Sequence, residues 1–126
     1  MQSLAPNIFV NDMPATIAFY QKLGFQITTS VPESGDYAWV MMTCGEISFM
    51  FQTYESLGTE MPEISRDQNS GPLLLYIRTK NIRTFFEEIK HFAKVLKGLE
   101  KTFYGATEFT IQDNNGMVLT FAEDEE

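Results

Sequence analysis

The chain has very little of the chemistry that cysteine and histidine supply. Cys44 is the single cysteine and His91 the single histidine among 126 residues. One cysteine excludes an intramolecular disulfide and a cysteine metal cluster. His91 falls on the outer side of a predicted helix, where we expect a solvated surface residue. The serines and Cys44 therefore have no nearby histidine to act as a base, which argues against a nucleophilic triad.

Basic residues are also scarce. Nine Lys and Arg stand against 17 Asp and Glu, which gives a net charge of −8. Nucleic-acid binding needs a basic surface to replace the counterions around phosphates, so we expect no nucleic-acid partner. An acidic surface is compatible with a cationic ligand. Part of the acidic excess lies in the tail 123–126, a pattern typical of a solvated chain end.

Long apolar runs and glycine-rich loops are missing as well. No window approaches the roughly 20 apolar residues of a membrane span, and no basic segment precedes an apolar run at the N-terminus. We therefore expect a cytoplasmic protein with no membrane partner. Gly35, Gly45 and Gly58 are isolated, so the sequence has no phosphate-binding loop.

The most informative stretch that is present is the segment 104–121. Phe109 and Ile111 alternate with polar residues, and Leu119 and Phe121 do the same after the turn-forming sequence 113–116. Asn and Gly tolerate the positive φ of tight turns, so this stretch predicts a β-hairpin. The chain length suits one domain, 1–126, with a sizeable core.

Alternation and helical periodicity predict the same order of elements in both halves, a strand, a helix and three strands. The predicted strands are 4–10, 25–31, 37–43, 47–54, 73–79 and 94–97 together with the two of the hairpin, and the predicted helices are 13–23 and about 82–93, capped by Asp12 and Asn81. Module one is about 4–54, the linker about 55–72 and module two about 73–123.

The two halves also align with each other. A shift of 69 positions places Ile8 on Ile77 and Asp12 on Asn81, and a shift of 71 places Gly45 on Gly116. Identities are few, but the order of caps and core positions agrees. We interpret the chain as a duplicated module.

The segments 8–12 and 18–25, followed by Tyr104-Gly105, Glu108-Phe109, Asp113, Gly116 and Leu119, resemble the glyoxalase/bleomycin-resistance/extradiol-dioxygenase superfamily. The closing hairpin is most similar to its bleomycin-resistance branch. The resemblance implies an α+β vicinal-oxygen-chelate fold, in which two βαβββ modules form a cup-shaped mixed sheet with helices outside and a ligand cavity inside. It also implies a homodimer.

Catalytic members of this family hold a divalent metal with one residue from the first and one from the last strand of each module. The corresponding positions here are Ala5, Phe49, Leu74 and Thr120. A transition-metal site needs imidazole, thiolate or carboxylate donors, and these positions supply none. We therefore expect no metal and no other cofactor. Isomerase, dioxygenase and thiol-transfer activities, which use the metal as a Lewis acid, are disfavoured.

Strand alternation predicts which side chains face into the cup. The candidate ligand-binding residues are Phe9, Trp39, Phe49, Phe51, Tyr76, Arg78, Tyr104, Glu108 and Thr120, with Tyr37 and Met41 also facing inward. An aromatic cavity with few polar groups indicates a small-molecule site, and Glu108 could pair with a cation. Two other interpretations remain open: the rings fill a closed cavity, and Glu108 is solvated or pairs with Arg78.

These patterns predict a metal-free protein that sequesters a hydrophobic or cationic aromatic ligand without altering it. The second hypothesis is a divergent enzyme of the superfamily, a lyase, isomerase or dioxygenase with an atypical site. Such an enzyme would use Glu108 with Tyr76 or Tyr104 for acid and base chemistry. The third is a structural or regulatory protein whose cavity is closed.

Overall fold

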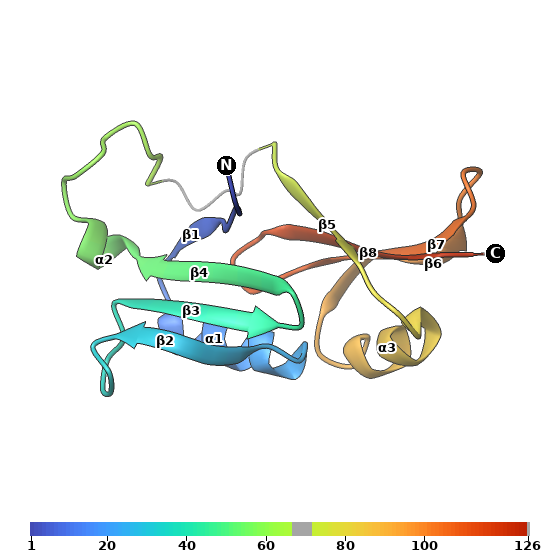
Figure 1. Ribbon diagram of the computed structural model, residues 1–126, viewed down its shortest axis with the longest axis horizontal. Coiled ribbons are helices and arrows are strands. Elements are labelled where there is room, and N and C mark those ends of the chain that lie inside the picture. The colour runs from blue at the N-terminus through green and yellow to red at the C-terminus, as the bar shows by residue number, and fades with distance from the viewer. Residues whose placement is uncertain (67–71, 126) are drawn as a thin grey trace. The chain divides into compact units, whose positions relative to one another are not determined.

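The computed structural model describes residues 1–66 and 72–125. The chain divides into two compact units, Met1–Asp67 and Gln68–Glu126. Each unit holds one four-stranded mixed sheet with a helix against one face (Figure 1). The fold is therefore α+β, as predicted. Among the described residues, no helix has the length and apolar character needed to cross a membrane.

The first unit follows the predicted order closely. Its elements are β1 (Asn7–Val10), α1 (Met13–Lys22), β2 (Gln26–Val31), β3 (Trp39–Cys44), β4 (Ile47–Thr53) and α2 (Tyr54–Leu57). The strand order is β1-β4-β3-β2, with β1 parallel to β4 and the other neighbours antiparallel. The short helix α2 lies where the sequence indicated the start of the linker. The part of the predicted linker at 67–71 lies outside the described residues.

Helix α1 begins as the sequence predicts. The Asp12 carboxylate accepts a hydrogen bond of 3.0 Å from the Ala15 amide, which satisfies a donor that the first turn leaves without a helical partner. Gly24 follows the helix with a φ of +108°. Such backbone conformations are common for glycine just after a helix and rare for residues with a Cβ. The cap and the glycine together set the length of α1.

The core of the first unit is a cluster of aromatic rings around Tyr20, which is fully buried on α1. Its ring lies 5.6 Å from Phe25, 5.7 Å from Phe49 and 4.7 Å from Phe51, measured between ring centroids. Edge-to-face and tilted pairs at such distances are favourable beyond the area they bury. The helix and the sheet are joined mainly through this cluster.

The prediction that Phe49 and Phe51 face the cup is therefore wrong. Their relative exposures are 4% and 0%, and both rings pack against α1. The error arises because the strand positions were counted from Gly45 and Gly116 as if these two glycines were equivalent. Gly45 begins a two-residue turn between β3 and β4, whereas five residues, 113–117, connect the matching strands of the second unit. Met50, one residue further on, pairs with Asn7 and lies on the other face.

The second unit repeats the arrangement. Its elements are β5 (Leu74–Arg78), α3 (Ile82–Ile89), β6 (Lys94–Lys101), β7 (Ala106–Gln112) and β8 (Val118–Asp124), and the strand order is β5-β8-β7-β6. Strand β5 is parallel to β8, and the other neighbours are antiparallel. His91 follows the end of α3 and is exposed, which agrees with the predicted surface position.

The start of α3 differs from the prediction. Asn81 has left-handed backbone angles and makes no side-chain cap. The carboxylate of Glu123 on β8 takes that role, since it accepts hydrogen bonds of 3.1 Å from the backbone amides of Asn81 and Ile82. The expectation that the acidic tail is wholly solvated is wrong at this residue. A carboxylate at a helix N-terminus is favoured by the amides and by the helix dipole.

The closing hairpin forms as predicted. Phe109 and Phe121 are buried and stacked with ring centroids 5.2 Å apart, and Phe85 of α3 packs on both. In the turn, the Asp113 carboxylate accepts hydrogen bonds of 2.8 Å from the amides of Asn115 and Met117. Alternate residues of β7 and β8 therefore point away from α3. We call this side of each sheet, opposite its own helix, the open face.

Candidate functional site

Three polar side chains meet on the open face of the second sheet. The phenols of Tyr76, from β5, and Tyr104, from the turn before β7, each donate a hydrogen bond of 2.5 Å to Oε2 of Glu108 on β7. We call Tyr76, Tyr104 and Glu108 the tyrosine–glutamate cluster. Sequence alternation predicted the direction of Tyr76 and Glu108, and the structure brings the two tyrosines to the same carboxylate oxygen.

The cluster is accessible. Tyr76 is 46% and Tyr104 57% exposed, and Glu108 is half-buried. Both phenols donate to Oε2, and no described residue donates to Oε1 of Glu108. That oxygen therefore remains an acceptor for a group arriving from outside. Two aromatic rings beside a carboxylate form an electron-rich surface that suits a cation.

The cluster also holds its tyrosines in the protonated form. The hydrogen bond to Glu108 raises the pKa of the Tyr76 phenol far above its usual range, and desolvation and the nearby negative charge act in the same direction. The same hydrogen bond raises the pKa of Tyr104. Both phenols thus remain hydrogen-bond donors at neutral pH, because deprotonation would place a second negative charge beside the carboxylate.

Thr120 adjoins the cluster through the sheet. It lies opposite Tyr76 in the β5–β8 pair, is buried, and its hydroxyl shares a hydrogen bond of 2.8 Å with that of Thr110. The hydroxyl is therefore occupied within the protein. Thr120 supports the floor of the open face, with little surface of its own to offer a ligand.

Arg78 lies two residues after Tyr76 on the same strand face. Its guanidinium is 4.0 Å from the Asp124 carboxylate, and both side chains are largely exposed. A surface pair at this distance adds little to stability. Arg78 pairs with Asp124, whereas the alternative interpretation had paired it with Glu108.

The first sheet carries a separate group on its own open face. Phe9 and Trp39 both lie opposite Gln52 in the ladder, from β1 and β3 respectively. The Gln52 amide oxygen accepts a hydrogen bond of 3.0 Å from Asn7. Sequence counting missed Gln52 and Met50 because it placed Phe49 and Phe51 on this face. The alternation within β4 indicated the correct face, since Ser48, Met50 and Gln52 are less apolar than the alternating Phe49 and Phe51.

The metal-binding positions implied by the resemblance hold no suitable donors. Ala5 and Leu74 have hydrocarbon side chains, Phe49 is in the core, and the Thr120 hydroxyl is bonded to Thr110. Met50, which replaces Phe49 once the register is corrected, offers only a thioether. Within residues 1–66 and 72–125, no group of three or more His, Cys, Asp or Glu side chains is arranged to hold a metal ion. These residues do not fit the family's metal.

A family model supports the relationship that the motifs and the fold indicate. The model of the Glyoxalase/Bleomycin resistance protein/Dioxygenase superfamily matches residues 3–121. The chain therefore belongs to this superfamily, as the sequence motifs predicted. No curated protein matches the chain.

Solved structures share the fold at low identity. A protein of unknown function from Agrobacterium tumefaciens C58 has a TM-score of 0.80 and 22% identity, covering 98% of this chain and 94% of that one. A bleomycin-binding protein in complex with bleomycin has a TM-score of 0.69 and 20% identity, covering 99% of this chain and 100% of that one. A glyoxalase-related enzyme from Fulvimarina pelagi has a TM-score of 0.78 and 13% identity, covering 98% of this chain and 89% of that one. The fold therefore occurs in both a binding protein and an enzyme.

Proposed function

We propose that this chain is a cytoplasmic, metal-free binding protein that sequesters a cationic or hydrophobic aromatic ligand on the open face of its second sheet. The observation that carries the proposal is the convergence of two phenols on one oxygen of Glu108. Such an arrangement fixes both rings and the carboxylate before any ligand arrives. A site organised in advance loses less conformational entropy on binding.

The chemistry of the cluster favours a ligand with a positive charge beside an apolar group. Glu108 Oε1 can accept from an ammonium or another N–H donor, and the faces of Tyr76 and Tyr104 can take the apolar part. Leu74, half-exposed on the same strand face as Tyr76, extends the apolar surface. The bleomycin complex of a protein with this fold makes bleomycin one reasonable probe.

Ligand retention and thermal shift test the proposal together. Protein purified from its native host and examined by native mass spectrometry should carry a small organic molecule that denaturation releases. In thermal-shift assays, phenyltrimethylammonium should raise the melting temperature more than its neutral isostere tert-butylbenzene. No retained molecule together with no response to bleomycin or to phenyltrimethylammonium would favour a closed structural or regulatory protein.

An enzyme is the second candidate, and the same cluster supports it. A phenol held protonated beside a carboxylate is a pair that can donate and accept protons. Turnover of a panel of small carbonyl, epoxide and catechol compounds should then be measurable and should disappear in Glu108→Gln. Turnover that survives this substitution would place any catalysis elsewhere in the chain.

A homodimer is the third part of the proposal. Strand β5 is at the edge of its sheet and follows the exposed Leu73, and a second copy would cover such an edge. Sedimentation equilibrium of the full chain should give twice the monomer mass. A monomer at all concentrations up to those used for binding would remove the dimer from the proposal.

A further inference from the structure

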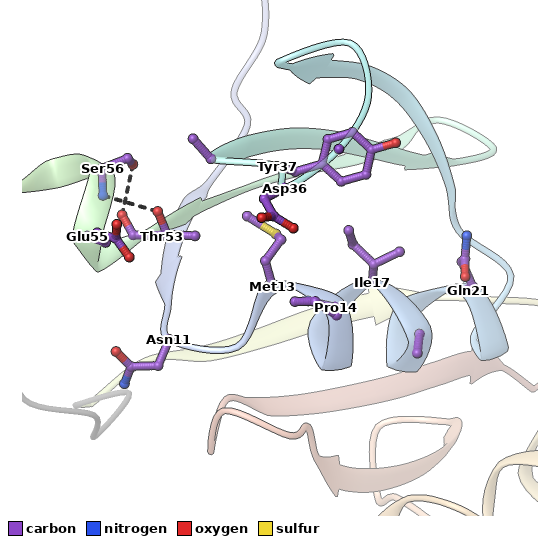
Figure 2. A pocket seen from close by; sticks show the side chains of 13 residues that line it. Asn11, Met13, Pro14, Ile17, Gln21, Asp36, Tyr37, Thr53, Glu55 and Ser56 are labelled. Carbon is purple, nitrogen blue, oxygen red and sulfur yellow. Dashed lines mark hydrogen bonds between the residues drawn. The ribbon is translucent and has the colours of Figure 1, made fainter.

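The first unit has a pocket on the side of its sheet where α1 packs, opposite the open face of that sheet. Its volume is about 720 Å³. Figure 2 shows Met13 and Ile17 projecting from α1 toward Asp36 and Tyr37, which precede β3, with Glu55 and Ser56 of α2 at the far side. Pockets of roughly 300–1,000 Å³ are typical of small-molecule sites.

Backbone pairing fixes the walls of this pocket. Val10, at the end of β1, lies opposite Thr53 at the end of β4. The Thr53 amide donates to the Ala38 carbonyl at 2.9 Å, and the Ala38 amide donates to the Val31 carbonyl at 2.8 Å. The segments that enter α1, β3 and α2 are therefore tied to one end of the sheet. Asp36 and Tyr37 belong to the connection between β2 and β3, directly before the bonded Ala38.

The floor of the pocket is apolar. Met13 is buried, Ile17 is half-buried, and the exposed Pro14 and Ala18 continue the same surface of α1. The half-buried Tyr37 adds its ring from above (Figure 2). The sequence placed Tyr37 inside the cup, but the structure places it here, because the residue precedes β3 and does not follow its alternation. A ligand body of hydrocarbon or aromatic character would remove this surface from water.

The rim of the pocket is acidic. Asp36, from the connection before β3, and Glu55 of α2 contribute carboxylates, and the described residues that line the pocket include no lysine or arginine. Ser56 is hydrogen-bonded to Thr53: its amide donates to the Thr53 hydroxyl at 3.1 Å and its hydroxyl donates to the Thr53 carbonyl at 2.9 Å. Two carboxylates and an aromatic ring beside an apolar floor attract a cation and repel an anion.

We propose that this pocket, lined by Met13, Ile17, Asp36, Tyr37 and Glu55, is a second ligand site that binds a small organic cation with an apolar body. The site lies wholly in the first unit and uses none of the residues of the tyrosine–glutamate cluster. Binding here therefore requires no part of the site proposed on the second sheet. The proposal does not rest on the function proposed for the second sheet.

NMR titration of the full, isotopically labelled chain tests this site directly. The probes are 2-phenylethylammonium and its uncharged counterpart 2-phenylethanol. The ammonium should shift amides in 11–21, 35–38 and 53–56, and it should bind about five- to tenfold more tightly than the alcohol, because two exposed carboxylates each add a modest attraction. Equal binding of the two probes, or shifts confined to the neighbourhood of Glu108, would overturn the proposal.

Matched variants separate charge from shape. The double variant Asp36→Asn/Glu55→Gln should raise the Kd for 2-phenylethylammonium about five- to tenfold and leave 2-phenylethanol unchanged. Glu46→Gln, an exposed carboxylate in the β3–β4 turn, is the control and should change the Kd less than about twofold. An unchanged Kd in the double variant contradicts the assigned site.

A blocking variant provides a second route that does not depend on the carboxylates. Ala18→Arg places a long cation on the exposed face of α1 at the pocket floor, where it should abolish binding of both probes. Glu108→Gln should leave these titrations unchanged, which separates this site from the one on the second sheet. If the pocket amides instead shift on dilution without any probe, a second copy of the chain occupies the pocket and the proposal fails.

Discussion

The phenol of Tyr76 donates a 2.5 Å hydrogen bond to Glu108 although the two residues are 32 positions apart and their strands are not neighbours. Strand β8 lies between β5 and β7, and its residue opposite Glu108 is Ala122. The residue opposite Tyr76 is Thr120, and both Thr120 and Ala122 are buried. The contact between the two functional residues therefore spans the strand that separates them.

The tyrosine–glutamate cluster should be visible in a spectroscopic titration. Glu108→Ala removes the hydrogen bond that contributes most to raising the pKa of Tyr76 and Tyr104. The near-ultraviolet absorbance of phenolate should then appear at lower pH than in the wild-type protein. Glu87→Ala, an exposed carboxylate on α3, is the control. Identical titration curves for the wild type and Glu108→Ala would mean that the cluster does not form in solution.

The same coupling predicts how stability depends on pH. The hydrogen bond to Glu108 holds the pKa of Tyr76 in the folded chain above the ordinary tyrosine value of 10.0. The hydrogen-bonded phenol therefore stabilises the fold below pH about 10, and this contribution is lost as the pH rises above that value. Tyr76→Phe should flatten this part of the profile, measured by urea unfolding across the alkaline range. A wild-type profile that does not fall more steeply than that of Tyr76→Phe contradicts the assignment.

The corrected register of β4 makes a prediction about stability. Phe49→Ala removes a buried ring from the cluster around Tyr20 and should lower the free energy of unfolding by about 3–5 kcal/mol. Met50→Ala, on the open face, should cost less, about 1 kcal/mol. Urea unfolding measures both. Similar losses for the two variants would mean that Phe49 is not in the core.

Residues with a strong local signal were predicted well from sequence. The alternation of Phe109, Ile111, Leu119 and Phe121 identified the closing hairpin and its buried face, and Asp12 identified the start of α1. Phe49 was misplaced because its position was counted from Gly45. The connection between β3 and β4 is shorter than the one between β7 and β8, so Gly45 and Gly116 are not equivalent. Its own strand alternates Phe with Ser, Met and Gln, so the pattern on β4 was the better guide.

Other features depend on contacts distant in sequence. Nothing near Asn81 indicates that Glu123 caps α3, because the two are brought together only by the pairing of β5 with β8. The meeting of Tyr104 with Tyr76 has the same origin. The pocket beside α1 also needed the structure, since its residues come from three segments that each look unremarkable alone.

The cap on α3 is testable by substitution. Glu123→Ala removes the acceptor for two backbone amides and should lower the free energy of unfolding by about 1 kcal/mol, within the range for helix caps. Asp124→Ala, whose ion pair with Arg78 is long and exposed, should change it by less than about 0.5 kcal/mol. Chemical denaturation of the two variants provides the comparison. Equal losses in the free energy of unfolding for the two variants would mean that Glu123 does not cap α3.

The most direct test of the proposed binding site is calorimetric titration of phenyltrimethylammonium into wild-type protein, Glu108→Gln and the control Glu87→Gln. The proposal predicts that Glu108→Gln weakens binding about tenfold, because the cation loses its carboxylate partner while the rings remain. Glu87→Gln should bind as the wild type does. If Glu108→Gln binds as tightly as the wild type, the open face of the second sheet is not the site.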